Sequence, residues 1–225
     1  MPPIPGLPLR HDYQRSGEEL VICIHGLWRS KYAMGKVAGK LQAEGYSTLN
    51  LAYPSYSATL EEMVEMLDEF ALHYAAVHPK IHFVTHSLGG VILRQLFNTR
   101  GVPKLGNVVM LAPPLRGSWI MDWLSESPFI KFFGPAGKFL SGSNMSDDVH
   151  GLPPRLMIIM GDKPKITCFQ GIFGEVANDG IVRVSSGRVD GGHEFLVLPV
   201  DHTLINSDPK VLDLTQRFIR NSVIW

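Results

Sequence analysis

Short apolar runs alternate along the chain with longer segments in which apolar residues recur every three or four positions. The short runs, each bounded by turn residues, predict buried strands over residues 20–24, 47–51, 81–85, 108–111, 156–160 and 195–200. The helical periodicity predicts helices over 32–43 and 60–77, directly after Ser87, and from about 209 to 219. This alternation predicts an α/β fold: a mostly parallel sheet of about six strands with helices on both faces.

Residues 113–154 interrupt the alternation. The segment is rich in Gly, Pro and Ser, yet it carries Trp119, Trp123 and several phenylalanines, so it is too apolar for a linker. Two interpretations stand side by side: a set of short helices that closes one end of the sheet, or a small cap that forms the substrate pocket. With 225 residues, of which 45% are hydrophobic, the chain suits a single domain over residues 1–225.

The charge balance narrows the class of partner. Lys plus Arg equals Asp plus Glu at 21 each, so no overall field attracts nucleic acid or an anionic membrane, and a small molecule is the expected partner. Two cysteines do not indicate a disulfide framework. The proline-rich start contains no apolar stretch of the length that a signal peptide or membrane span needs, which predicts a cytoplasmic protein without a transmembrane segment.

The first candidate for chemistry is Ser87, in the sequence Thr-His-Ser-Leu-Gly-Gly. It follows a predicted buried strand and precedes a predicted helix, where a sharp turn exposes a nucleophilic serine. Such a turn needs small residues because the helix crosses close to the strand, and Gly89 and Gly90 meet this need on the downstream side. Thr85 is bulkier than the upstream position prefers. The alternative is an ordinary serine N-cap.

A second motif, His25-Gly26-Leu27-Trp28, directly follows the first strand. We predict that the backbone N–H groups of Leu27 and Leu88 form an oxyanion hole, because these two positions flank the expected nucleophile from a loop and from a helix N-terminus. His25 is expected to fix the loop through hydrogen bonds and not to carry protons.

A serine hydroxyl needs a base to activate it and an acid to orient that base. Among nine histidines, His202 is the preferred base because it directly follows the last predicted strand. His193, in a turn before that strand, is the rival. His86 neighbours the nucleophile and cannot easily face its hydroxyl.

Asp179, in the turn Asn-Asp-Gly-Ile-Val, is the preferred acid. Its rival is Asp162, which ends the strand over 156–160 but is followed by two lysines that suggest a solvated charge. Asp201, beside the proposed base, is expected to be a surface group.

Together these motifs resemble the bacterial class 2 lipases and esterases of the α/β-hydrolase superfamily, as does Tyr-Pro-Ser at 53–55. The resemblance implies an α/β-hydrolase fold with a minimal cap, and hydrolysis of a carboxylic ester or lipid through an acyl-enzyme formed by Ser87, His202 and Asp179. It implies no metal or organic cofactor, and the sequence holds no clustered carboxylate loop for calcium. Trp28 and Trp119 are the candidate substrate-binding residues.

Three other functions remain open at this point. An acyltransferase or thioesterase would use the same three residues with a different acceptor or substrate. A non-catalytic binding module could reuse the scaffold, since fold does not guarantee activity. An amidase or peptidase would need to protonate a poorer leaving group.

Overall fold

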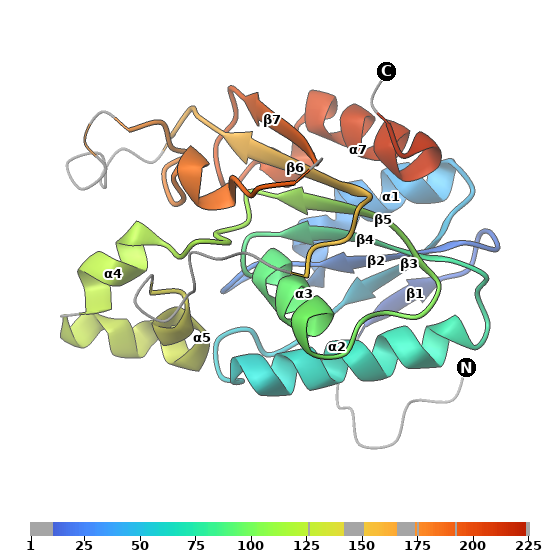
Figure 1. The fold of residues 1–225 in the computed structure, drawn as a ribbon, viewed down its shortest axis with the longest axis horizontal. Coiled ribbons are helices and arrows are strands. Elements are labelled where there is room, and N and C mark those ends of the chain that lie inside the picture. Colours follow the sequence, from blue (N-terminus) through green and yellow to red (C-terminus); the bar gives the residue numbers. More distant parts are fainter. Residues whose placement is uncertain are drawn as a thin grey trace.

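The computed structural model describes residues 11–125, 127–141, 151–165, 174, 176–191 and 193–223. These residues form a seven-stranded sheet in the order β1-β3-β2-β4-β5-β6-β7 (Figure 1). All neighbouring strands are parallel except β1 and β3 at one edge. The strands are β1 (Asp12–Gln14), β2 (Leu20–Ile24), β3 (Ser47–Leu51), β4 (Ile81–His86), β5 (Leu105–Leu111), β6 (Leu156–Gly161) and β7 (Glu194–Leu198).

Helices cover both faces of this sheet (Figure 1). The α-helices are α1 (Gly35–Ala43), α2 (Leu60–Ala75), α3 (Leu88–Thr99), α4 (Trp119–Ser125), α5 (Gly134–Phe139) and α7 (Pro209–Asn221). The 3-10 helices are η1 (Lys31–Met34), η2 (Pro128–Phe133), η4 (Val184–Gly187) and η5 (Ile205–Ser207). Helices α2 and α3 pack on one face of the sheet, and α1 and α7 pack on the other.

The period-two alternation of side chains along each strand builds the two halves of the core. In β2, Leu20, Ile22 and Ile24 join the apolar cluster under α2 and α3. Val21 and Cys23 point to the opposite face and join the cluster under α1 and α7. A strand that is buried on both faces therefore has an unbroken apolar sequence, which is why the inner strands were predictable.

The predicted α/β fold is confirmed, with differences at the sheet edge and at some element ends. The prediction omitted β1, a short strand with the sequence Asp-Tyr-Gln that has no apolar run and pairs antiparallel with β3. Strand β5 begins at Leu105, earlier than predicted. The prediction missed its first residues because Gly106 and Asn107 interrupt the apolar pattern. The first turn of the helix predicted over 32–43 is the 3-10 helix η1.

Residues 113–125 and 127–141 follow the C-terminal end of β5 and lie beyond that edge of the sheet, whereas 151–154 lead into the start of β6. The described residues of the segment over 113–154 form α4, η2 and α5, which pack against one another (Figure 1). Residues 126 and 142–150 of this segment lie outside the described part of the chain. The short helices both close this end of the sheet and face the candidate site, so the two interpretations of the segment are compatible.

Helix α3 crosses the end of β2 at very short range. A Cβ atom at Gly89 would lie 2.7 Å from the carbonyl oxygen of Ile24 and 2.9 Å from that of His25. Both neighbours are backbone atoms that the sheet holds in place, so they have little freedom to withdraw. Glycine at this position therefore lets the helix begin directly over the sheet.

We expect Gly89→Ala to lower the free energy of unfolding by about 1–3 kcal/mol, because the added methyl group overpacks against fixed backbone. Gly39→Ala is the matched control. Gly39 is exposed in α1 with no atom within 4 Å of an added Cβ, and there alanine should stabilise the helix by about 0.5–1 kcal/mol. Urea unfolding of the two variants measures both effects, and equal stability of the two would contradict the close-packing argument.

Candidate active site

Ser87 sits on a sharp turn between β4 and α3. Its backbone has φ 54° and ψ −121°, a conformation that side-chain-bearing residues rarely adopt. The turn is held by hydrogen bonds from the Ser87 amide to the Leu111 carbonyl, at 2.9 Å, and from the Gly90 amide to the Ser87 carbonyl, at 2.9 Å. This geometry lifts the serine side chain out of the sheet and into a cavity.

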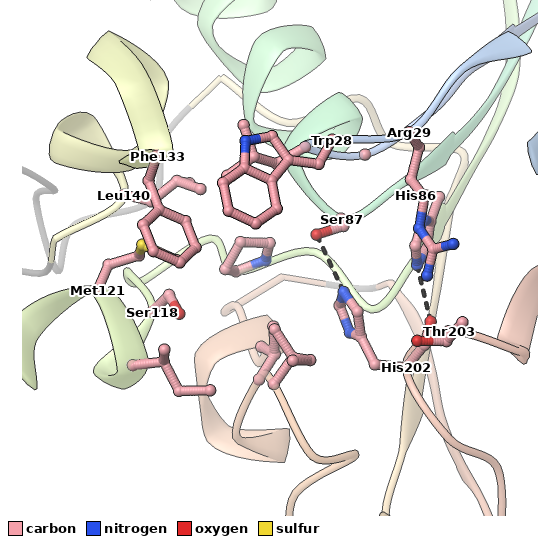
Figure 2. A pocket seen from close by; sticks show the side chains of 16 residues that line it. Trp28, Arg29, His86, Ser87, Ser118, Met121, Phe133, Leu140, His202 and Thr203 are labelled. Atoms are coloured by element: carbon pink, nitrogen blue, oxygen red, sulfur yellow. Dashed lines mark hydrogen bonds between the residues drawn. The ribbon is translucent and has the colours of Figure 1, made fainter. Parts of the chain in front are cut away.

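His202 links Ser87 to a buried carboxylate. Its Nε2 lies 3.1 Å from the Ser87 hydroxyl oxygen, and its Nδ1 lies 2.7 Å from Oδ2 of Asp179. A carboxylate only accepts hydrogen bonds, so Nδ1 carries the proton and Nε2 presents a lone pair to the serine hydroxyl. Figure 2 shows the contact between His202 and Ser87 at the cavity wall.

Asp179 is completely buried, and its own turn satisfies its charge. Oδ1 accepts hydrogen bonds from the amides of Ile181, at 3.0 Å, and Val182, at 2.7 Å, which leaves Oδ2 for His202. The Asp179 carbonyl also accepts a bond from the His202 amide, at 3.0 Å. Two loops that are distant in sequence are thus joined through both backbone and side chain.

The rival residues lie elsewhere. Asp162 is exposed at the end of β6. His193 directly precedes β7, so it lies near the edge of the parallel sheet opposite to the one where β4 delivers Ser87. The expectation that Asp201 is a surface group is wrong: it is buried, and its carboxylate accepts bonds from the amides of Lys165, at 3.1 Å, and Thr203, at 2.8 Å. It holds the loop that carries His202.

His86 has a role that the sequence reasoning missed. Its Nε2–H donates to the carbonyl oxygen of His202 at 3.0 Å, so the residue before the serine anchors the backbone of the histidine loop. Burial, together with the nearby His202 ring, holds the pKa of His86 well below its usual value. The neutral ring donates this bond through Nε2. The sign of this role in the sequence was a histidine directly before the serine.

The loop after β2 brings backbone amides next to Ser87. A Cβ at Gly26 would lie 3.0 Å from the Cβ of Ser87, so only glycine allows this approach. Leu27 lines the cavity beside Ser87, and Leu88 is the first residue of α3, where an amide has no acceptor within its own helix. Both residues are therefore close to Ser87, and the role of their amides as oxyanion donors stays a prediction.

His25 stabilises the loop after β2 through a hydrogen bond and a ring stack. Its Nδ1–H donates to the Gly26 carbonyl at 2.9 Å, and its ring stacks on Tyr53 with centroids 4.2 Å apart. Burial lowers the pKa of His25 to about 4. The Trp28 amide donates to the Ser55 hydroxyl at 3.2 Å, which ties the loop to the turn after β3.

The cavity beside Ser87 has a volume of about 400 Å³ and a mostly apolar wall (Figure 2). Trp28 lines it and stacks on Phe133 with ring centroids 4.7 Å apart, which joins the β2 loop to η2. Trp119 does not line it: its ring faces the guanidinium of Arg183, with 3.2 Å between the guanidinium carbon and the ring centroid. The apolar lining residues are Leu27, Trp28, Pro114, Ile120, Met121, Phe133, Leu140, Ile181 and Val182.

Neither a metal-binding cluster nor a membrane span is found in the part of the chain that the structure describes. There, no three His, Cys, Asp or Glu side chains come together in a way that could hold a metal ion. No helix within the same residues is long and apolar enough to cross a bilayer.

Comparison with known proteins identifies the family. A model of the alpha/beta hydrolase family matches residues 21–159, which is more than half of the chain. The chain belongs to the alpha/beta hydrolase family. No curated protein matches the sequence of this hydrolase at a significant level.

Solved structures resemble this alpha/beta hydrolase over nearly its whole length. The mature Bacillus licheniformis lipase BlEst2 is 19% identical, with a TM-score of 0.69, over 88% of this chain and 89% of the other. The monoacylglycerol lipase of Paleococcus ferrophilus is 19% identical, with a TM-score of 0.59, over 95% and 97%. The type II thioesterase BorB of the borrelidin biosynthetic cluster is 17% identical, with a TM-score of 0.56, over 93% and 96%. At these identities the likeness establishes the fold.

The low pKa of His25 predicts a loss of stability in acid. Between pH 6.5 and about 4 the unfolded chain binds a proton at His25 while the folded chain does not, so stability falls as the pH falls through this window. This difference in the pKa of His25 between the folded and unfolded chain corresponds to a loss of roughly 3 kcal/mol in the free energy of unfolding across the window. Urea unfolding at several pH values should therefore give a shallower pH dependence for His25→Asn than for the wild type.

His73→Gln is the matched control for this measurement, because His73 is a partly exposed histidine on α2. The comparison separates the effect of burial at His25 from the effect of removing a histidine from the chain. A slope for His25→Asn as steep as that of the wild type would contradict the assignment.

Proposed function

We propose that this alpha/beta hydrolase cleaves carboxylic esters of small molecules or lipids, with Ser87 as the nucleophile, His202 as the general base and Asp179 as the group that orients it. One observation carries the proposal: a continuous hydrogen-bonded chain from the Ser87 hydroxyl through His202 to a buried Asp179, at the wall of an apolar cavity. The lipase and thioesterase structures with the same fold agree with this reaction class.

The reaction begins with proton transfer from Ser87 to Nε2 of His202 as the serine oxygen attacks the ester carbonyl. The imidazolium that forms is stabilised by Asp179, which is held in place by two amides and therefore needs no reorganisation. The oxyanion of the tetrahedral intermediate would accept hydrogen bonds from the amides of Leu27 and Leu88.

Collapse of this intermediate expels the alcohol, which takes the proton from His202 and leaves an acyl group on Ser87. Water then attacks the acyl-enzyme with His202 again acting as the base, and the acid is released. Every proton moves through His202, so the scheme needs no other acid or base.

The apolar cavity supports an acyl group as the part of the substrate that is buried. Trp28 and Phe133 close one side of the cavity as a stacked pair, and Met121 and Leu140 face the interior (Figure 2). Trp119, which lies outside this wall, is not proposed as a substrate-binding residue.

A fluorophosphonate probe tests the nucleophile. We expect one covalent adduct on the wild type and none on Ser87→Ala, as read from the intact mass. Ser118→Ala is the matched control, because Ser118 is a second buried serine that lines the same cavity. The control should label like the wild type, and labelling of Ser87→Ala at the wild-type rate would overturn the assignment.

The orienting carboxylate gives a second test. Asp179→Asn should lower kcat for a 4-nitrophenyl ester by about 10⁴-fold, because the amide no longer favours the tautomer of His202 that accepts the serine proton. The matched control is Asp162→Asn, which alters the exposed rival carboxyl and should leave kcat near the wild-type value. A larger loss in Asp162→Asn than in Asp179→Asn would reverse the assignment of the acid.

A further inference from the structure

Two hollows meet at the loop that follows β2. One is the apolar cavity beside Ser87. The other is a more open groove of about 470 Å³ lined by Trp28, Arg29, Tyr53, Pro54, Ser55 and Tyr56. Trp28 and Arg29 line both, so the two hollows adjoin at these residues.

Among the described residues that line the two hollows, Arg29 is the only Arg, Lys, Asp or Glu. Its side chain is exposed, and it forms no ion pair with the carboxylates of the described residues. A guanidinium is always charged and offers a planar set of donors that suits carboxylate and phosphate oxygens. A cation at the mouth of an apolar cavity, with no carboxylate partner in the described part of the chain, favours an anionic ligand.

The position of Arg29 shows which part of a substrate would reach it. In Figure 2 the apolar wall lies on one side of Ser87, and Arg29 and Thr203 lie on the other. The Arg29 amide donates to the Gly26 carbonyl at 3.3 Å, so the residue belongs to the same turn as Leu27. An acyl chain in the apolar cavity therefore leaves the opposite side of the scissile bond, that of the leaving group, facing Arg29.

We propose that Arg29 binds an acidic group, a carboxylate or a phosphate, on the leaving-group side of the substrate. This inference rests on the proposed ester hydrolysis and specifies the substrate class: esters with an apolar acyl chain and an anionic alcohol. Thr203 lines the same side of the cavity and offers a hydroxyl donor. Charge-assisted hydrogen bonds of this kind typically change kcat/KM by about 10- to 100-fold.

Two matched esters test the proposal: 3-carboxy-4-nitrophenyl butanoate and 3-carbamoyl-4-nitrophenyl butanoate, which share an acyl chain and differ in the charge of the leaving group. The wild type should cleave the carboxylate ester with the higher kcat/KM. Arg29→Gln should lower the ratio of the two kcat/KM values at least about tenfold, and Arg29→Lys should retain part of it. Lys31→Gln is the matched control, since Lys31 lies outside both hollows and should keep the wild-type ratio.

Phenyl phosphate and benzoate, added as inhibitors of carbamoyl-ester hydrolysis, distinguish the two anions: the one that inhibits at the lower concentration is the better match to the site. A ratio that is the same in the wild type and in Arg29→Gln would overturn the Arg29 proposal while leaving ester hydrolysis intact. A folded wild type that cleaves neither ester and forms no fluorophosphonate adduct would instead overturn the proposed function and, with it, this inference.

Discussion

The strained turn at Ser87 is the constraint on which the candidate site depends. A residue with a side chain occupies a positive φ there, at a cost of order 1–3 kcal/mol that the surrounding packing must offset. Two contacts offset this cost. The Ser87 amide donates to the Leu111 carbonyl of β5, and α3 packs closely on the end of β2, which Gly89 permits. The turn at Ser87, helix α3 and the adjoining edge of the sheet are therefore held together by direct contacts.

Two buried carboxylates, Asp179 and Asp201, lie near His202, and of these two only Asp179 contacts its ring. The Asp179 carboxylate is satisfied by amides of its own turn. His25 and His86 lie close to the site, but burial lowers the pKa of each, so neither adds a positive charge that would oppose an imidazolium at His202. Such an arrangement suits a base that gains and loses a proton during turnover. Arg29 places its charge at the mouth, where solvent and ligands can reach it.

The cavity is assembled from segments that are far apart in the sequence. The β2 loop contributes Trp28, the segment over 113–154 contributes Phe133, and the stacking of these two rings closes the wall between them. On the other side, Asp201 pins the loop of His202 to the backbone after β6. The pocket shape thus depends on contacts between loops, while the rigid sheet sets the position of the serine.

The sequence by itself determined the inner strands and the covering helices, because buried parallel strands have unbroken apolar runs. It also singled out Ser87 and His202 directly after predicted strands, and Asp179 in a turn motif, as candidate residues. Only the tertiary structure decided the rest. Strand β1 forms through backbone pairing that needs no apolar pattern, and Asp201 is buried where its carboxylate accepts a bond from the amide of Lys165, a residue distant in the sequence. The bond from His86 to the His202 carbonyl, like the place of Trp119 against Arg183 outside the cavity, joins residues far apart in the chain, and local periodicity carries no information about such pairs.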